Sequence, residues 1–252
     1  MHGPMGCLSM SPLSRLSPSL KASIRQRLGF IGSVVSVQTA QPEIVLTFDD
    51  GPDPVGTEAV MSALAAHRAT ATFFVLMTRV RAFSSLLDEL VEAGHEIGLH
   101  GPDHQPLSTF SHAEAKRRTA DARAALEEQL SSKIRWFRPP YGRQTLSSWH
   151  AVTSSGLTPV MWGPTAWDWR DLPQHDRVWK AQQGAARGAI LLGHDSFAGA
   201  LDGVPDNKAP AIDRRDLVDR VLGAYAERGL SGVSLGAALE HGSAVLAARF
   251  RR

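Results

Sequence analysis

Short apolar runs alternate with longer amphipathic segments along most of this 252-residue chain, and that alternation constrains the fold more than any other feature. The apolar runs predict strands at 33–39, 44–48, 71–76, 95–100, 134–138, 158–162, 189–194 and 230–235. The amphipathic segments predict helices near 56–67, 82–93, 111–130, 146–155, 174–187, 212–228 and 235–240. Such strand–helix alternation favours a parallel α/β domain.

Local signals at the ends of the predicted helices support these boundaries. Ser111 followed by Glu114 has the spacing of a capping box at a helix start. Gly94, Gly156 and Gly229 each follow a helical segment, where a glycine commonly ends the helix.

The chain divides into three parts. Residues 1–32 are expected to form a Ser-, Pro- and Gly-rich tail with a short basic helix, residues 33–240 the folded domain, and residues 241–252 a C-terminal tail. A composition with 43% hydrophobic and 21% charged residues is ordinary for a globular protein of this length.

Charge and cysteine content exclude several classes of function. The net charge of +2 is dispersed rather than gathered into a basic stripe, so we expect no nucleic-acid partner. The single cysteine, Cys7, excludes an internal disulfide framework and a cysteine-based zinc site. No apolar stretch is long enough to span a bilayer, so we expect no transmembrane anchor. The oligomeric state stays open.

The N-terminal region leaves two interpretations of localisation. Residues 25–40 contain basic residues, a short apolar run and a small residue, which fits a signal peptide ending near Ala40. The preceding charged segment is unusually long, however, and residues 34–39 alternate as a strand does. We therefore expect a cytoplasmic protein, with secretion as the alternative.

Polar residues gather where the predicted strands end: Asp49 and Asp50, His100, Arg138 and His194. In a β/α barrel, the chemistry is carried at the carboxyl ends of the strands. Two adjacent carboxylates at the end of an apolar strand repel each other, so a nearby positive charge is expected.

His100 and His104 can supply part of that charge by holding a metal ion. Gly101-Pro102 breaks any helix between them, so they lie on a strand end and its loop. As an isolated pair they would be two unrelated loop histidines. With Asp50 they complete the two-imidazole, one-carboxylate set of hydrolytic zinc sites, and Zn²⁺, Co²⁺ or Mn²⁺ would suit it. Asp49 is then free to act as a general base.

Two further strand ends offer partners for the acids. Arg138, before two prolines, is either a surface arginine on a rigid turn or a guanidinium that holds Asp49 in place. His194 is either a core histidine or the acid that protonates a leaving amine. Asp168, between two tryptophans, belongs either to the core or to a wall of the site.

Taken in order, the segments TFDDGP (47–52), HGPDH (100–104), RPPYG (138–142), DW (168–169) and LLGHD (191–195) resemble the five motifs of the polysaccharide deacetylase family. This family is also called carbohydrate esterase family 4 or the NodB-homology domain. The resemblance covers about residues 33–240. It implies an α/β fold, a distorted (β/α) TIM-like barrel with about seven parallel strands, and metal-dependent removal of N-acetyl or O-acetyl groups from an acetylated carbohydrate.

The resemblance also implies roles for the reacting residues. Asp49 corresponds to the catalytic base and His194 to the general acid. Asp50, His100 and His104 correspond to the ligands of the divalent metal, expected to be Zn²⁺ with Co²⁺ or Mn²⁺ as alternatives.

Other matched positions would support these groups. Arg138 corresponds to the arginine that orients the base, and the Tyr141 backbone N–H to the oxyanion donor. Asp168 corresponds to the aspartate that supports either the acid or the arginine. The residues expected to contact the substrate are Pro139, Trp169 and Leu192.

Two positions depart from the family pattern, and one segment is unusually long. Gly101 stands where the second motif usually has a hydroxyl residue, and Thr165 stands where the fourth motif usually has an acid. Residues 196–215 form a long Gly-, Pro- and Asp-rich segment after His194, which we interpret as a lid or a substrate-binding wall.

Two alternative functions remain open. The same site could hydrolyse a non-sugar amide or cyclic imide, or the domain could be a catalytically inactive carbohydrate-binding module. Retention of both the acid–base pair and the metal ligands argues against the second. With 2 Tyr and 9 Phe, no aromatic ladder for a long polymer is evident, which favours short oligosaccharides or a monosaccharide conjugate.

Overall fold

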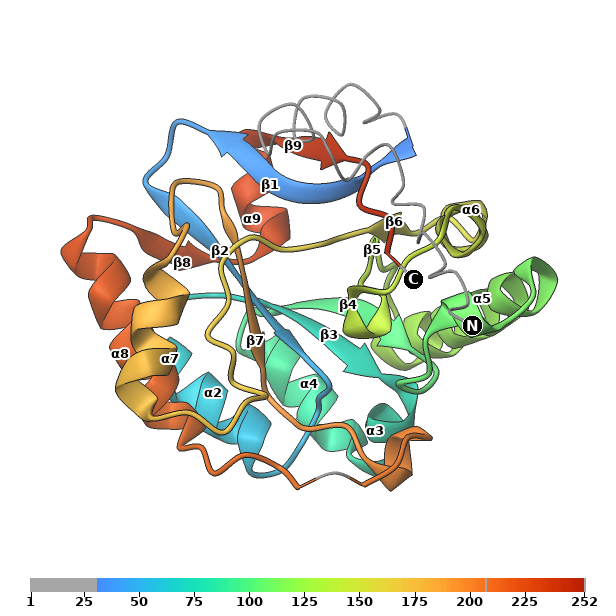
Figure 1. Cartoon of the computed structure of the whole chain (residues 1–252), viewed down its shortest axis with the longest axis horizontal. Helices are drawn as coiled ribbons and strands as arrows, with labels where there is room; N and C mark the ends of the chain where they lie inside the picture. The colour runs from blue at the N-terminus through green and yellow to red at the C-terminus, as the bar shows by residue number, and fades with distance from the viewer. Residues whose placement is uncertain (1–30, 207, 252) are drawn as a thin grey trace, which may run out of the picture.

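The computed structural model describes residues 31–206 and 208–251, which form a parallel sheet surrounded by helices (Figure 1). The predictions for residues 1–30, including the tail, the short helix and the signal-peptide alternative, fall outside the described residues.

Seven parallel strands make the main sheet, in the order β6-β5-β4-β3-β2-β7, with β8 beside the first half of β2. This confirms the predicted α/β class. The strands are β2 (Glu43–Asp49), β3 (Thr72–Leu76), β4 (Glu96–Gly101), β5 (Trp136–Phe137), β6 (Thr158–Pro159), β7 (Ile190–His194) and β8 (Ser231–Val233).

The two ends of this sheet, β6 and β7, are linked through strand β1 (Ser33–Thr39). Val34 forms a parallel bridge with Val160, just after β6, and Ser36 forms an antiparallel bridge with Ala189, just before β7. Irregular bridges of this kind bring the two edges of the sheet together, as expected of a distorted barrel.

Strand β1 also pairs antiparallel with β9 (Gly242–Ala247), at the top of Figure 1. The prediction that 241–252 forms a tail is therefore wrong for this segment. The backbone of β9 pairs with an edge of β1, more than 200 residues earlier in the chain. A pairing over that separation leaves no local sequence signal.

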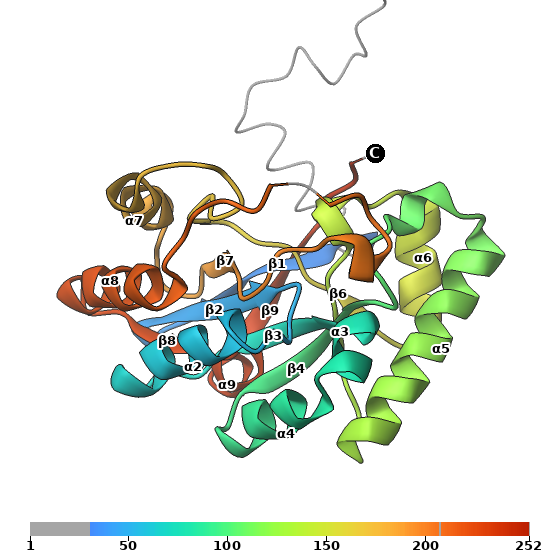
Figure 2. The same cartoon turned by 90° about the horizontal axis from the view of Figure 1, so that it is seen from below.

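Helices flank the sheet on its outer side, as the second view shows (Figure 2). No described helix is both long and apolar enough for a membrane span. The helices are α2 (Gly56–Ala66), α3 (Met77–Ala82), α4 (Ser84–Glu92), α5 (His112–Leu130), α6 (Leu146–Ser154), α7 (Gln174–Gln182), α8 (Arg214–Glu227) and α9 (Leu235–Glu240), with single 3₁₀ turns η3 (Leu107–Thr109), η4 (Pro140–Gly142) and η5 (Ala200–Asp202).

The predicted helix ends agree with these bounds in most cases. Ser111 accepts a hydrogen bond from the Glu114 N–H, although the Glu114 carboxylate pairs with Arg117 rather than completing the capping box. The predicted helix 82–93 instead spans the end of α3 and all of α4. Phe83, with a φ of −138° and a ψ of 51°, is not helical and separates the two helices.

The alternation of side chains along β2 separates the outer core from the barrel interior. Ile44, Leu46 and Phe48 pack into the large core under the helices, whereas Val45 faces the inner cluster. With a period of two, Thr47 and Asp49 share the inner face with Val45. The acid therefore points into the barrel at the carboxyl end of its strand.

Helix α9 packs against the inner cluster with Leu235 and Ala238, both fully buried. We expect Leu235→Ala to lower the free energy of unfolding by about 2–5 kcal/mol, since it leaves a cavity in a packed interior. Urea denaturation measures this loss. Val91→Ala, on the exposed side of α4, is the control and should change stability by less than about 0.5 kcal/mol. Equal losses in both variants would contradict the assigned packing.

Candidate active site

The sequence Asp49-Asp50-Gly51 forms a sharp backbone turn at the end of β2. Asp50 has a φ of +79°, a conformation that Asp and Asn tolerate better than most residues. The Gly51 N–H donates to the buried Asp195 carboxylate at 3.1 Å, and a Cβ at Gly51 would collide with that carboxylate. The turn thus directs the two neighbouring acids to different partners.

Asp49 forms an ion pair with Arg138 inside the barrel. Arg138 Nη1 donates to Asp49 Oδ1 at 2.8 Å and to Thr47 Oγ1 at 2.7 Å, and its side chain is fully buried. The guanidinium also lies over the Phe74 ring, 4.2 Å from the ring centre. The structure therefore favours the buried partner over the surface arginine, and it adds Thr47, which the sequence analysis did not identify.

Asp50, His100 and His104 form the cluster expected of a metal site. Their ligand atoms all lie within 4.8 Å of one another, and all three residues are buried. Asp50 Oδ1 is 3.3 Å from His100 Nε2 and 3.2 Å from His104 Nε2. It is a buried oxygen without a hydrogen-bond partner, as expected of an atom that binds a cation.

The surroundings of both histidines suit metal binding. His100 Nδ1 donates to the Arg138 carbonyl oxygen at 2.8 Å, which leaves the Nε2 lone pair directed toward Asp50. Burial lowers the pKa of His104 to about 4, so this ring is neutral at physiological pH. Two imidazoles and one carboxylate fit Zn²⁺ and similar divalent ions.

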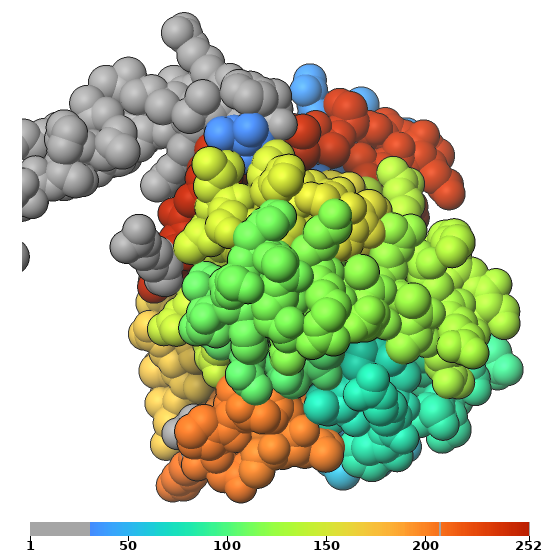
Figure 3. Space-filling view, turned by 90° about the vertical axis from the view of Figure 1, so that its right-hand side faces the viewer, coloured from blue at the N-terminus to red at the C-terminus, as the bar shows by residue number. Residues whose placement is uncertain are grey.

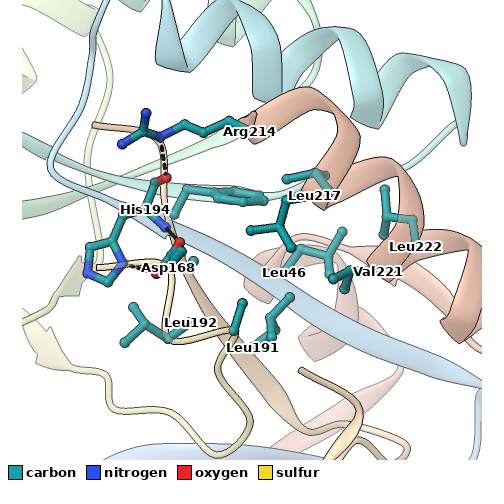
Figure 4. A pocket seen from close by; sticks show the side chains of 13 residues that line it. Leu46, Asp168, Leu191, Leu192, His194, Arg214, Leu217, Val221 and Leu222 are labelled. Carbon is teal, nitrogen blue, oxygen red and sulfur yellow. Dashed lines mark hydrogen bonds and ion pairs between the residues drawn. The ribbon is translucent and has the colours of Figure 1, made fainter. Parts of the chain in front are cut away.

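Asp168 supports His194 rather than Arg138, which decides between the two predicted roles. Its carboxylate accepts from His194 Nδ1 at 2.8 Å and from the His194 backbone N–H at 2.6 Å (Figure 4). Burial alone would lower the pKa of His194, but the charge and hydrogen bond of Asp168 raise it to about 9. His194 is thus protonated at neutral pH, with Nε2 as its second N–H donor.

These groups open into one cleft with a volume of about 630 Å³. Tyr141, Trp169 and Leu192 line it together with the acids and histidines, and the Trp169 ring lies edge-on to His194 at 5.3 Å. Tyr141, with a φ of +58°, packs against the His104 ring. Pro139 is buried and does not line the cleft; its carbonyl instead accepts from Gly142 N–H.

The long segment 196–215 forms a wall of this cleft, since Ser196, Phe197, Ala198 and Val204 line it. In the space-filling view, the orange residues near 200 pack against the green and teal segments (Figure 3). In this structure the described residues of the segment lie at the side of the cleft, and both predicted roles stay open.

Asp202 connects this wall to the candidate metal-binding residues. Its fully buried carboxylate pairs with Arg79 at 2.8 Å and accepts from Thr78 Oγ1. The Asp202 carbonyl oxygen accepts from the backbone N–H of His104 at 2.9 Å. The pair of Asp202 and Arg79 is not apparent from the sequence, because two charged residues 123 positions apart give no sign of pairing.

The two departures from the family pattern have local explanations. Gly101 has a φ of +145°, and a Cβ there would lie 2.7 Å from the Asp103 carbonyl oxygen, so a side chain would not fit this loop conformation. Thr165 is buried, and its hydroxyl accepts from the Trp167 N–H rather than contacting the acids.

Comparisons with known proteins agree with this geometry. The family model described as polysaccharide deacetylase matches residues 36–160. The chitooligosaccharide deacetylase of Sinorhizobium fredii is 33% identical over 172 residues, which cover 68% of this chain and 80% of the relative. The peptidoglycan-N-acetylmuramic acid deacetylase PdaC of Bacillus subtilis is 30% identical over 169 residues, covering 66% of this chain and 35% of the relative.

The solved structure of PdaC from Bacillus subtilis superimposes with a TM-score of 0.67 at 26% identity, covering 80% of this chain and 91% of that one. The chain belongs to the polysaccharide deacetylase family, as its motifs indicate. It is a hydrolase of carbon–nitrogen bonds other than peptide bonds.

The anchoring contact is open to a direct test. We expect Asp202→Asn to lower the free energy of unfolding by about 3–5 kcal/mol, because it leaves Arg79 buried with its charge poorly compensated. Urea denaturation measures the change. Asp121→Asn removes an exposed ion pair with Arg117 and should cost no more than about 1 kcal/mol. A loss this small in Asp202→Asn would show that the wall does not depend on the pair.

Proposed function

We propose that this protein removes the acetyl group from an N-acetylated amino sugar, releasing acetate and a free amine, with the help of a divalent cation. One observation carries the proposal. The cluster of Asp50, His100 and His104 lies in the same cleft as Asp49, a candidate base, and His194, a candidate acid. Metal-assisted hydrolysis of an amide uses these three kinds of group together.

The cation would be held by Asp50, His100 and His104, with Zn²⁺ as the first expectation and Co²⁺ or Mn²⁺ as alternatives. When bound, such an ion lowers the pKa of a water molecule and polarises a carbonyl oxygen. The unpartnered Asp50 Oδ1 and the Nε2 atoms of the two histidines would supply the three protein ligands.

The chain's own residues move the protons. Asp49 accepts the proton of the attacking water, and the Arg138 guanidinium keeps its carboxylate oriented. The Tyr141 N–H donates to the carbonyl oxygen as negative charge develops there. His194, protonated and held by Asp168, gives its Nε2 proton to the amine as the carbon–nitrogen bond breaks.

The relatives support an acetylated carbohydrate as the substrate, since the two named above are deacetylases of chitooligosaccharides and of peptidoglycan. An O-acetyl sugar or a non-sugar amide would use the same groups and differs only in what the cleft walls contact. A purely carbohydrate-binding role is disfavoured, because binding needs no buried acid–base pair.

The direct test measures acetate released from chitin oligomers, peptidoglycan fragments, acetylxylan and a small non-sugar acetamide. We expect acetate from one or more of the N-acetylated sugars, loss of activity after chelation, and recovery on adding zinc or cobalt. Acetate from the acetamide alone would overturn the choice of a sugar. Full activity in protein shown by elemental analysis to be metal-free would overturn the mechanism.

Substitution of the two adjacent acids should impair different properties of the enzyme. Asp50→Asn should lose bound metal, because a neutral amide is a poor replacement for the anionic ligand. Asp49→Asn should keep the metal but lose turnover by about 10²-fold or more, since an amide cannot accept the proton. Metal content by elemental analysis and acetate release together measure this. An equal loss of metal in both variants would contradict the assignment.

The support of His194 by Asp168 predicts a specific pH dependence. Because His194 must be protonated to act, activity should fall as the pH rises through the raised pKa, near 9. Asp168→Asn removes the charge that raises this pKa, so the alkaline limb of kcat/KM should move to lower pH. Asp171→Asn, an exposed acid in the same loop, is the control. An unmoved alkaline limb in Asp168→Asn would assign that limb to another group.

A further inference from the structure

The rim of the cleft is positively charged. Four exposed cationic side chains line it, and they come from four separate segments: Arg143, Arg170, Lys208 and Arg251. Arg143 and Arg251 belong to neighbouring segments, because Gln144 and Arg251 exchange backbone hydrogen bonds of 2.8 and 2.7 Å. Arg170 follows the cleft residue Trp169, and Lys208 belongs to the wall formed by 196–215.

These four cations have no anionic partner within the described part of the chain. Each of the ion pairs found there involves other residues. Arg143 instead lies over the Tyr141 ring and Arg170 over the Trp167 ring, at 5.4 and 4.4 Å. Residues 1–30, 207 and 252 contain no Asp or Glu side chain.

The acids in the cleft are unavailable to the rim, because they are buried at its floor. Asp49 pairs with Arg138 and Asp168 with His194, whereas Asp50 Oδ1 lies beside the two histidines without a hydrogen-bond partner. With a divalent cation at Asp50, the floor would carry one net positive charge, since the other two pairs are neutral. Nothing in the cleft would therefore repel an anionic substrate.

Unpaired cations around a recessed site raise the local concentration of anions and bind them directly. The planar guanidinium groups of Arg143, Arg170 and Arg251 match a carboxylate or a phosphate in shape and hydrogen-bonding pattern. A neutral N-acetylated sugar offers these groups no partner. We infer that the natural substrate is an acetylated saccharide bearing a carboxylate or phosphate outside its acetamido group, and that the cationic rim binds this anion.

This inference rests on the proposed function for its acetamido part, but not for anion binding. The cleft also leads into a neighbouring hollow of about 350 Å³, which shares Tyr141, Trp162 and Arg251 with it. A substrate longer than one sugar could thus place its anionic unit beside Arg251 while the acetyl group reaches the cleft floor.

The first experiment compares kcat/KM for three substrates: a neutral chitin disaccharide, a disaccharide containing N-acetylmuramic acid, and N-acetylglucosamine 1-phosphate. We expect at least one anionic substrate to exceed the neutral one by about tenfold, equivalent to about 1.4 kcal/mol. The advantage should shrink as the salt concentration rises from about 0.05 to 0.5 M. The two anionic arms distinguish a carboxylate from a phosphate.

The rim variants test which side chains are responsible. The double variant Arg143→Gln/Arg251→Gln and the double variant Arg170→Gln/Lys208→Gln should each be measured for the anionic-to-neutral ratio of kcat/KM. We expect the ratio to fall several-fold in at least one of them. Arg187→Gln, an exposed arginine just before β7 at the opposite end of that strand from His194, is the control and should keep the parent ratio. A ratio unchanged in both double variants would overturn the inference.

A second measurement does not depend on turnover. Calorimetry should show tighter binding of muramic acid or glucosamine 1-phosphate than of glucosamine, and the rim variants should lose this difference. Equal binding of the three compounds would overturn the inference even if the enzyme deacetylates sugars. Selective anion binding without any acetate release would support anion binding by the cationic rim but contradict the proposed deacetylase function.

Discussion

The buried Arg138 determines how the two halves of the candidate site lie relative to each other. Its guanidinium binds Asp49, and its backbone carbonyl accepts from the His100 ring. A fully buried guanidinium is tolerated only when its charge is paired, and the barrel provides that pair at the end of β2. The candidate base and one candidate metal ligand are therefore oriented by the same residue, and a shift of β5 relative to β2 would disturb both.

Much of this arrangement could be predicted from the sequence, because the deciding signals are local. The apolar runs fixed the strand positions, and the period-two alternation from Val45 to Asp49 placed an acid on the inner face. The five motifs marked the strand ends. Strands β5 and β6 are shorter than expected, at two residues each. Proline lies at or just after their ends, at Pro139 and Pro159, and cannot donate to a neighbouring strand.

The contacts that could not be predicted join distant residues without a recognisable pattern. Strand β9 pairs with β1, and Asp202 pairs with Arg79, across most of the fold. The sequence also left open whether Asp168 supports His194 or Arg138, since a carboxylate near both side chains could pair with either. Only the spatial arrangement, with β7 next to the 165–168 segment through the Thr165–Leu192 bridge, settles it.

The distribution of charge with depth connects these observations. At the floor, each acid is buried next to a cationic or metal-binding residue. The charges there therefore interact with one another and orient the reactive groups. At the rim, the four cations are exposed and have no anionic partner among the described residues, so they remain available to a ligand. An unpaired charge costs much free energy when it is buried, but little when it is exposed to water. The floor can thus act on an acetamide, which is neutral, while the rim responds to whatever charge the rest of the substrate carries. Chemistry and selectivity would then depend on different residues, which could vary independently among proteins of this fold.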